Sequence, residues 1–230
     1  MSRHTTLRAE QLETRDLPAS TYMWRMPMGG DQKWSTAGNW QVGGNTAITP
    51  PGPSDTVVFD SGNMAGSTAD VPSVYKLDIQ NGYTGLIQID ESITDFNINT
   101  ISMSSSSARL YDWIGANVNV SSNLSWSAGA IAGARVRIGS QTNSLATGTI
   151  NPVADLQNNV FGEVVLGSSA AGPCVFENYG TLTWASGNIT CRTGNTSVEN
   201  YGTFTVNSTG ALRKGDPGIY TFDNNDSGLV

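Results

Sequence analysis

The sequence is poor in charged residues, cysteine and histidine. Charged residues make up 13% of the chain, about half the share of roughly 25% that is usual for a soluble domain. Two cysteines and one histidine form no Cys/His cluster, which argues against a structural zinc site. The histidine is His4, so no serine or cysteine nucleophile in the body of the chain has a histidine partner. We therefore expect no hydrolase of the Ser-His-Asp or Cys-His type.

Long apolar runs are also missing. None approaches the roughly 18 residues of a membrane-spanning helix, so we expect no membrane span. The formal net charge is −7, and the basic residues of the body are scattered among carboxylates. Because a nucleic-acid partner requires clustered Lys and Arg, we expect no nucleic-acid binding. The two cysteines, Cys174 and Cys191, leave open whether they form a disulfide bond.

Short runs of Val, Ile, Thr, Phe and Tyr, punctuated by Gly and Asn, dominate what is present. The chain has 26 glycines, and strong helix formers are sparse after the first twenty residues. This pattern is typical of many short strands separated by turns. We predict an all-β protein.

Residues 1–20 differ from the rest of the chain, with Arg, Glu and Leu at near-helical spacing before Pro18. They lack the apolar stretch of an ordinary secretory signal peptide. Leu7, Glu10, Leu12, Glu13, Arg15, Leu17 and Pro18 resemble the short segment, related to the LEPR-XLL motif, that opens many large planctomycete surface proteins. The chain departs from that motif in Thr14 and in Asp16-Leu17-Pro18. The resemblance implies a sorting or processing segment, and a secreted or cell-surface location.

Residues 21–60 form a Trp-rich block that includes Trp24, Trp34 and Trp40. The pattern W-S-x-x-x-N-W, followed by a Pro-rich turn and the predicted strand Thr56–Phe59, resembles the opening module of secreted bacterial β-solenoids. The first coil of a solenoid needs a cover for its apolar core and strand edges. We predict that the three indoles are buried in a cap, although a sugar-stacking platform is the alternative.

The C-terminal third of the chain repeats itself. Residues 176–184 align without gaps to residues 198–206, with 22 residues between Asn178 and Asn200, and a third repeat begins near Phe222. A more distant similarity aligns residues 124–131 with residues 182–189. A unit of this length, with apolar residues alternating with Thr, suits one coil of a parallel β-helix. Stacked coils would place Asn178 over Asn200, Tyr179 over Tyr201 and Leu182 beneath Phe204.

We therefore predict a right-handed parallel β-helix over residues 61–230, with coils of about 22 residues, behind the cap of residues 21–60. An antiparallel β-sandwich is the alternative, because residues 71–118 show strands without clear repeats. The favoured function is a non-catalytic structural or adhesion solenoid, with cell-surface polysaccharide or other envelope proteins as partners. The alternative function is a carbohydrate-active β-helix that binds or cleaves polysaccharide.

Catalysis by such a fold requires paired carboxylates on its outer surface. The densest acidic group comprises Asp78, Asp90, Glu91, Asp95 and Asp112. The repeat also stacks Glu177 and Glu199, but a repeated outward Glu is more typical of a solvated structural face. We assign no catalytic, cofactor-binding or metal-binding residue and expect no enzyme and no cofactor.

Two features concern the end of the sequence. Residues 223–228 are rich in Asp and Asn, as in some calcium-binding turns, but they lack the closing Glu of an EF-hand. No capping segment follows Phe222, so we expect residues 226–230 to form a frayed strand or open edge of an incomplete array. Such an edge predicts edge-to-edge self-association.

Overall fold

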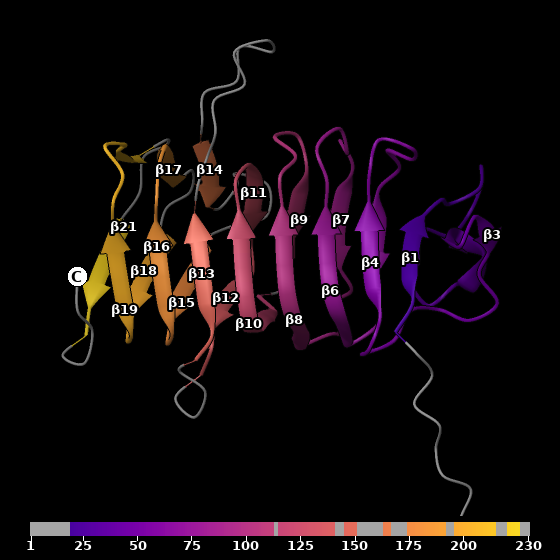
Figure 1. Cartoon of the computed structure of the whole chain (residues 1–230), viewed down its shortest axis with the longest axis horizontal. Coiled ribbons are helices and arrows are strands. Elements are labelled where there is room, and N and C mark those ends of the chain that lie inside the picture. Colours follow the sequence, from indigo (N-terminus) through magenta and orange to yellow (C-terminus); the bar gives the residue numbers. More distant parts are fainter. Residues whose placement is uncertain are drawn as a thin grey trace, which may run out of the picture.

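The computed structural model shows a parallel β-helix whose coils stack along one axis, from the indigo N-terminal strands to the yellow C-terminal strands (Figure 1). The prediction of an all-β solenoid is thus confirmed. The antiparallel sandwich was the wrong alternative, since the antiparallel pairs of the described strands are confined to β1–β2 and β2–β3. The structure describes residues 19–112, 115–140, 145–150, 163–166, 174–191, 196–214 and 220–225.

A fourteen-stranded sheet, here called the long sheet, forms one wall of the solenoid. The sheet divides into two halves along its length. Strands β6, β8 and β10 are each the single long strand that their coil contributes, whereas each later coil contributes two short strands, so that β10 pairs with both β12 and β13. The strands of the long sheet are β1 (Thr21–Trp24), β2 (Trp40–Val42), β3 (Asn45–Thr46), β4 (Thr56–Phe59), β6 (Ser73–Ile79), β8 (Asp95–Met103), β10 (Asn117–Trp126), β12 (Arg135–Ile138), β13 (Thr147–Ile150), β15 (Val175–Asn178), β16 (Thr181–Trp184), β18 (Thr196–Asn200), β19 (Thr203–Val206) and β21 (Tyr220–Asn224).

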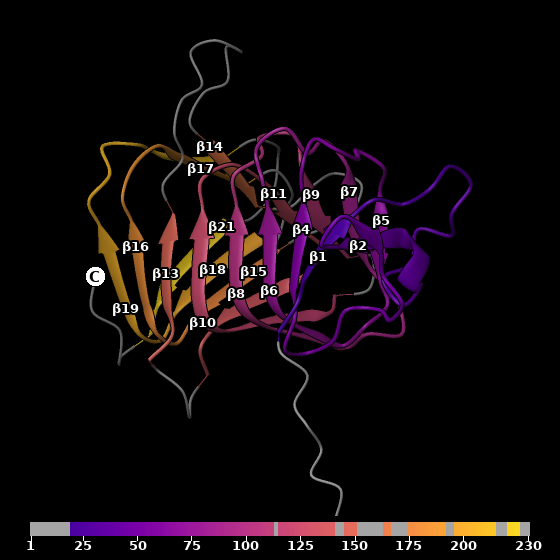
Figure 2. The same ribbon diagram turned by 45° about the vertical axis from the view of Figure 1, so that its right-hand side comes forward.

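A seven-stranded sheet, the short sheet, forms the opposite wall and contributes one strand to each coil (Figure 2). All its neighbouring strands pair in parallel. Its strands are β5 (Ser67–Ala69), β7 (Leu86–Ile89), β9 (Arg109–Tyr111), β11 (Gly129–Ala132), β14 (Glu163–Leu166), β17 (Asn188–Cys191) and β20 (Leu212–Lys214).

The 22-residue repeat has the register that the sequence predicts. Asn178 lies level with Asn200, and Leu182 lies level with Phe204. The third repeat is also confirmed, because Val198 pairs with Phe222. The repeat length is not uniform along the solenoid, since Arg135 pairs with Val175, 40 positions away. Extra residues between the strands of one coil therefore leave the pairing of these strands with the next coil intact.

The more distant similarity is correct in the long sheet and shifted in the short sheet. Trp126 and Trp184 occupy the same column, with Ile150 between them, and both indoles donate to carbonyls of the turn that follows. The alignment also equates Ile131 with Ile189, but the structure places Gly129 level with Ile189. A shift of two residues keeps each side chain on the same face of the sheet, so the sequence pattern does not reveal it.

The cap buries all three tryptophans, as predicted. Trp24, Trp34 and Trp40 are each fully inaccessible to solvent. Trp40 packs edge to face against Trp24, Trp34 and Phe59, and the rings of Trp24 and Trp34 are tilted by 34° to that of Phe59, with centroid distances of 4.9 to 5.8 Å. The first strand, β1, also pairs in parallel with β4, so the Trp-rich block both covers the core and begins the sheet.

The W-S-x-x-x-N-W pattern has a structural explanation. The Trp40 indole donates to the carbonyl of Trp34 at 2.9 Å, and the buried Asn39 amide donates to Asp31 Oδ1 and the Lys33 carbonyl. Ser35 donates through its backbone and its hydroxyl to Asp70. These contacts close the segment around η1 (Ala37–Asn39), a single turn of 3-10 helix.

Candidate functional site

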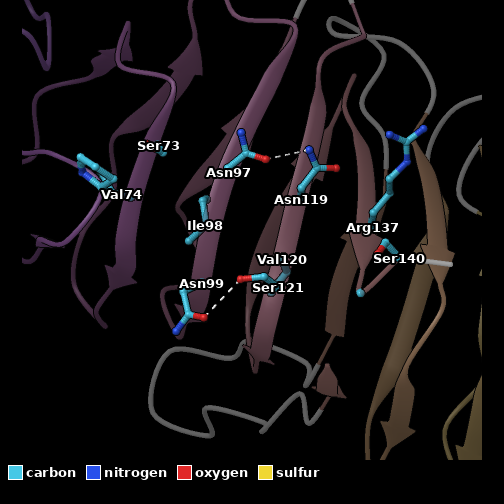
Figure 3. Close-up of a pocket in the computed structure, with 12 residues that line it drawn as sticks. Ser73, Val74, Asn97, Ile98, Asn99, Asn119, Val120, Ser121, Arg137 and Ser140 are labelled. Atoms are coloured by element: carbon cyan, nitrogen blue, oxygen red, sulfur yellow. Dashed lines mark hydrogen bonds between the residues drawn. The ribbon is translucent and has the colours of Figure 1, made fainter. Parts of the chain in front are cut away.

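A hollow of about 510 Å³ crosses four consecutive coils on the outer surface of the long sheet (Figure 3). We call it the polar trough. It lies over β6, β8, β10 and β12, beside the point where β10 shifts register between Val120 and Asn123. Its polar lining residues are Ser73, Asn97, Asn99, Asn119, Ser121, Arg137 and Ser140, and Pro53, Val74, Ile98, Val120 and Gly139 complete it.

Strand alternation places these polar side chains on the outer surface. Ile98 and Val120 are buried, so Asn97, Asn99 and Asn119 on either side of them point outward. The parallel register then places Asn97 level with Asn119, and Asn119 level with Arg137. The trough is therefore the outer surface of a regular ladder.

Hydrogen bonds between coils orient the amides of the trough. Asn119 Nδ2 donates to Asn97 Oδ1 at 3.0 Å and to Asp95 Oδ1 at 3.3 Å (Figure 3 shows the first). Ser121 Oγ donates to Asn99 Oδ1 at 3.2 Å. These bonds leave Asn119 Oδ1 as an acceptor and Asn99 Nδ2 as a donor for a ligand.

Asp95 lies at the end of this ladder. Its carboxylate accepts hydrogen bonds from the amides of Asn117 and Asn119, and these bonds lower the pKa of Asp95 below its usual value. The group is therefore a fixed anion that orients amides. A general acid needs a raised pKa instead, so Asp95 is unsuited to that role.

A carboxylate of the next coil partly offsets the positive charge of Arg137 at one end of the trough. Arg137 Nε donates to Glu177 Oε2 at 2.6 Å, and Arg135 forms a second ion pair with Glu177. Glu177 is almost completely buried, so the expectation of a solvated outward Glu was wrong for this residue. Arg135 and Arg137, both on β12, cover the carboxylate of Glu177. The 22-residue spacing of the C-terminal repeats does not reveal these arginines, because β12 lies outside those repeats.

The second repeated glutamate has a different environment. Glu199 is half-buried and accepts hydrogen bonds from the hydroxyls of Ser197 and Tyr201 at 3.1 and 3.0 Å. The bond from Tyr201 to Glu199 raises the pKa of that phenol to about 12. Tyr179 and Tyr201 stack as predicted, with ring centroids 4.7 Å apart and planes within 6°.

The other acidic candidates do not converge. Asp78 lies level with Ser102, seven residues along β8 from Asp95, which corresponds to about 23 Å at about 3.3 Å per residue. Asp90 accepts hydrogen bonds from Ser92 in the turn after β7, where Glu91 is exposed. Asp112 is buried and accepts a hydrogen bond from the backbone of Ala116.

The described part of the chain contains no cluster of potential metal ligands. No group of three or more His, Cys, Asp or Glu side chains there could hold a metal ion. In the Asx-rich C-terminal segment, Asn224 Oδ1 accepts a hydrogen bond from Asn200. Cys174 is buried. Residues 1–18, with the sorting segment and His4, and residues 226–230, with the expected open edge, lie outside the described residues, as does the side chain of Cys191.

The trough was not predicted from the sequence, although the sequence contains a signal for it. Residues 95–99 and 117–121 have matching polar and apolar positions, and 22 residues separate Asn97 from Asn119 and Asn99 from Ser121. This is the period of the C-terminal repeats. Extending that period toward the N-terminus would have found the ladder.

Comparison with known proteins found no matching family, no similar curated protein and no similar solved structure. Among the residues that the structure describes, none forms a helix of the length and apolarity that a membrane span requires.

Proposed function

We propose that this chain is a non-catalytic adhesion solenoid, secreted or displayed at the cell surface, that contacts polysaccharide along the polar trough. The observation that carries the proposal is the trough itself, which offers amides and hydroxyls from successive coils on one outer surface. From Ser73 to Arg137 it crosses three coil steps of about 4.8 Å each, or roughly 14 Å, which suits a short segment of a glycan chain.

The chemistry of the lining favours an uncharged, hydroxyl-rich ligand. Asn119 Oδ1 and Asn99 Nδ2 provide an acceptor and a donor, and both amides are already oriented by bonds to neighbouring coils. Sugar hydroxyls both donate and accept, so they can use both groups. Glu177 pairs with Arg137 and reduces the positive charge at this end of the trough.

Binding without cleavage is supported by the absence of carboxylates among the lining residues. Glycoside hydrolysis needs two carboxyl groups at a set separation, one of them protonated. Asp95, the acid beside the trough, has a lowered pKa. The resemblance of residues 7–18 to a planctomycete surface-protein segment supports the proposed location.

The test is titration of the purified chain with soluble polysaccharides, neutral and acidic, by calorimetry. We expect a neutral polysaccharide to bind and Asn119→Leu to weaken binding about tenfold, the equivalent of about 1.4 kcal/mol. Asn207→Leu is the matched control, because Asn207 is exposed and far from the trough in the repeat. Failure of every polysaccharide to bind, an equal effect of both variants, or release of new reducing ends would overturn the proposal.

A further inference from the structure

The second half of the long sheet carries a regular array of threonines on its outer surface. Strands β13, β16 and β19 lie side by side (Figure 1) and place Thr147, Thr181 and Thr203 in one row. Thr149, Thr183 and Thr205 form a second row in the same register. We call these six residues the threonine face.

The hydroxyls of this face are available to an external partner. Thr147 Oγ1 lies 3.0 Å from Asn123 Oδ1 on the preceding coil, to which it donates. The other five hydroxyls form no hydrogen bond to the part of the protein that the structure describes. In the trough, by contrast, the outward groups of neighbouring coils bond to one another. The threonine face therefore presents unused donors and acceptors at every step.

Charge is segregated away from the face. The array continues onto β10 and β8 as uncharged positions, with Ser125 level with Thr149 and Ser102 level with Ser125, and it ends at β6, where Asp78 lies level with Ser102. The charged outward residues of the same coils, such as Arg137, Glu177 and Glu199, lie on the other half of the sheet. High β-propensity explains threonine on an outer strand position, but it does not explain why both rows exclude charge.

The positions of the hydroxyls and methyls are rigid. Threonine is β-branched and therefore restricted at χ1. The inward positions between the two rows are Gly148, Leu182 and Phe204, which are all buried. Equivalent groups repeat about every 4.8 Å between coils and about every 6.6 Å along a strand. The face is thus a fixed two-dimensional lattice of hydroxyl and methyl groups.

A partner for such a lattice must itself be periodic, uncharged and able to accept and donate hydrogen bonds. We infer that the threonine face binds the surface of ice, where planes of water oxygens repeat over distances of the same order. The methyl groups order the first layer of water and the hydroxyls bond to it. The lattice repeats in two directions, whereas a single polysaccharide chain repeats in one direction, which favours a crystalline surface as the partner.

The test is to measure, under a microscope, the gap between the freezing and melting temperatures of a small ice crystal in solutions of the purified chain. We expect a gap that grows with protein concentration. Thr183→Lys places a flexible charge in the middle of the face and should abolish the gap. Thr46→Lys makes the same substitution at an exposed position of β3 and should preserve the gap.

Circular dichroism and urea unfolding establish that both variants fold. Asn119→Leu, the trough variant, should also preserve the gap, which separates this inference from the proposed polysaccharide binding. Three results would overturn the inference: no gap for the unmodified chain, equal losses in Thr183→Lys and Thr46→Lys, or binding to an insoluble polysaccharide that Thr183→Lys abolishes while ice growth is unaffected by the chain.

Discussion

The side-chain amide of Asn178 donates to Asn200 Oδ1 on the next coil at 2.8 Å, and Asn200 donates in turn to Asn224 Oδ1 at 2.7 Å. Asn178 and Asn200 are completely buried. Asn178 also donates to the Thr203 carbonyl of the next coil, whereas Asn200 donates to the Gly202 carbonyl of its own coil. A buried polar column of this kind is stable because its members bond to one another.

Replacement of the central amide should destabilise the C-terminal coils. Asn200→Leu has a similar volume but leaves the Asn224 and Gly202 acceptors without their donor, so we expect the free energy of unfolding to fall by about 1–3 kcal/mol. Urea denaturation followed by circular dichroism measures the change. Asn207→Leu, at an exposed position, is the control, and equal midpoints for the two variants would contradict the prediction.

The cap should be the most sensitive part of the N-terminal half. Trp34 packs against Trp40, Phe59 and Phe96 and donates to Ser67 Oγ at 3.1 Å. Trp34→Ala should lower the free energy of unfolding by about 3–5 kcal/mol, because it opens a cavity that these rings cannot fill. Chemical denaturation is again the measurement. Ile48→Ala removes a side chain that is 95% exposed and should have no measurable effect.

Acid should weaken the attachment of the cap to the first coil. Arg25 donates two hydrogen bonds to Asp60, at 2.7 and 2.8 Å, and these hold the pKa of Asp60 below its ordinary value of 3.8. A carboxyl group whose folded pKa is lowered contributes stability above its unfolded pKa and loses this contribution as the pH falls through the folded value. Asp60→Asn should therefore lower the thermal midpoint at pH 7.

The same comparison at falling pH provides the check on this prediction. The difference between the unmodified chain and Asp60→Asn should shrink as the pH falls through the lowered pKa of Asp60, because both side chains then become uncharged. Glu91→Gln removes an exposed carboxylate in a turn and is the matched control. A difference that stays constant from pH 7 to pH 2 would show that the ion pair with Arg25 is not its source.

The sequence predicted the repeat, the stacking of the tyrosines and the buried tryptophans because these features depend on local periodicity and on residue type. It did not predict the buried state of Glu177, because the arginines that cover it lie on the preceding coil. That coil is offset by 40 positions, as between Arg135 and Val175, and not by the 22 positions of the C-terminal repeats. Asn97 and Asn119 were missed for another reason: the two segments match in polar and apolar character but differ at most positions in the amino acid itself.

Self-association at the C-terminal end is the fourth prediction. Val206, Leu212 and Phe222 lie on the last described strands of three columns and are each exposed by 39 to 46%. Exposed apolar ends of a stack favour contact with a second copy of the chain. Sedimentation of the purified chain should therefore show larger species as concentration rises.

A lysine at this end should suppress the association by repelling a second copy. Leu212→Lys is the variant, and Ile48→Lys, at an exposed apolar position in the cap region, is the control. Monomers at every concentration, or equal suppression by both variants, would show that this end of the stack is not the contact.

The 40-position step between Arg135 and Val175, against 22 between Asn178 and Asn200, also bears on how such chains evolve. Because each coil takes its register from the coil before it, a stretch of coding sequence can lengthen between two coils without repacking the interior. A duplicated coil can likewise enter the gene and find its ladder partners already in place. Selection can then act on loops and on outer surfaces independently, while the column of inward side chains keeps the protein folded through each change.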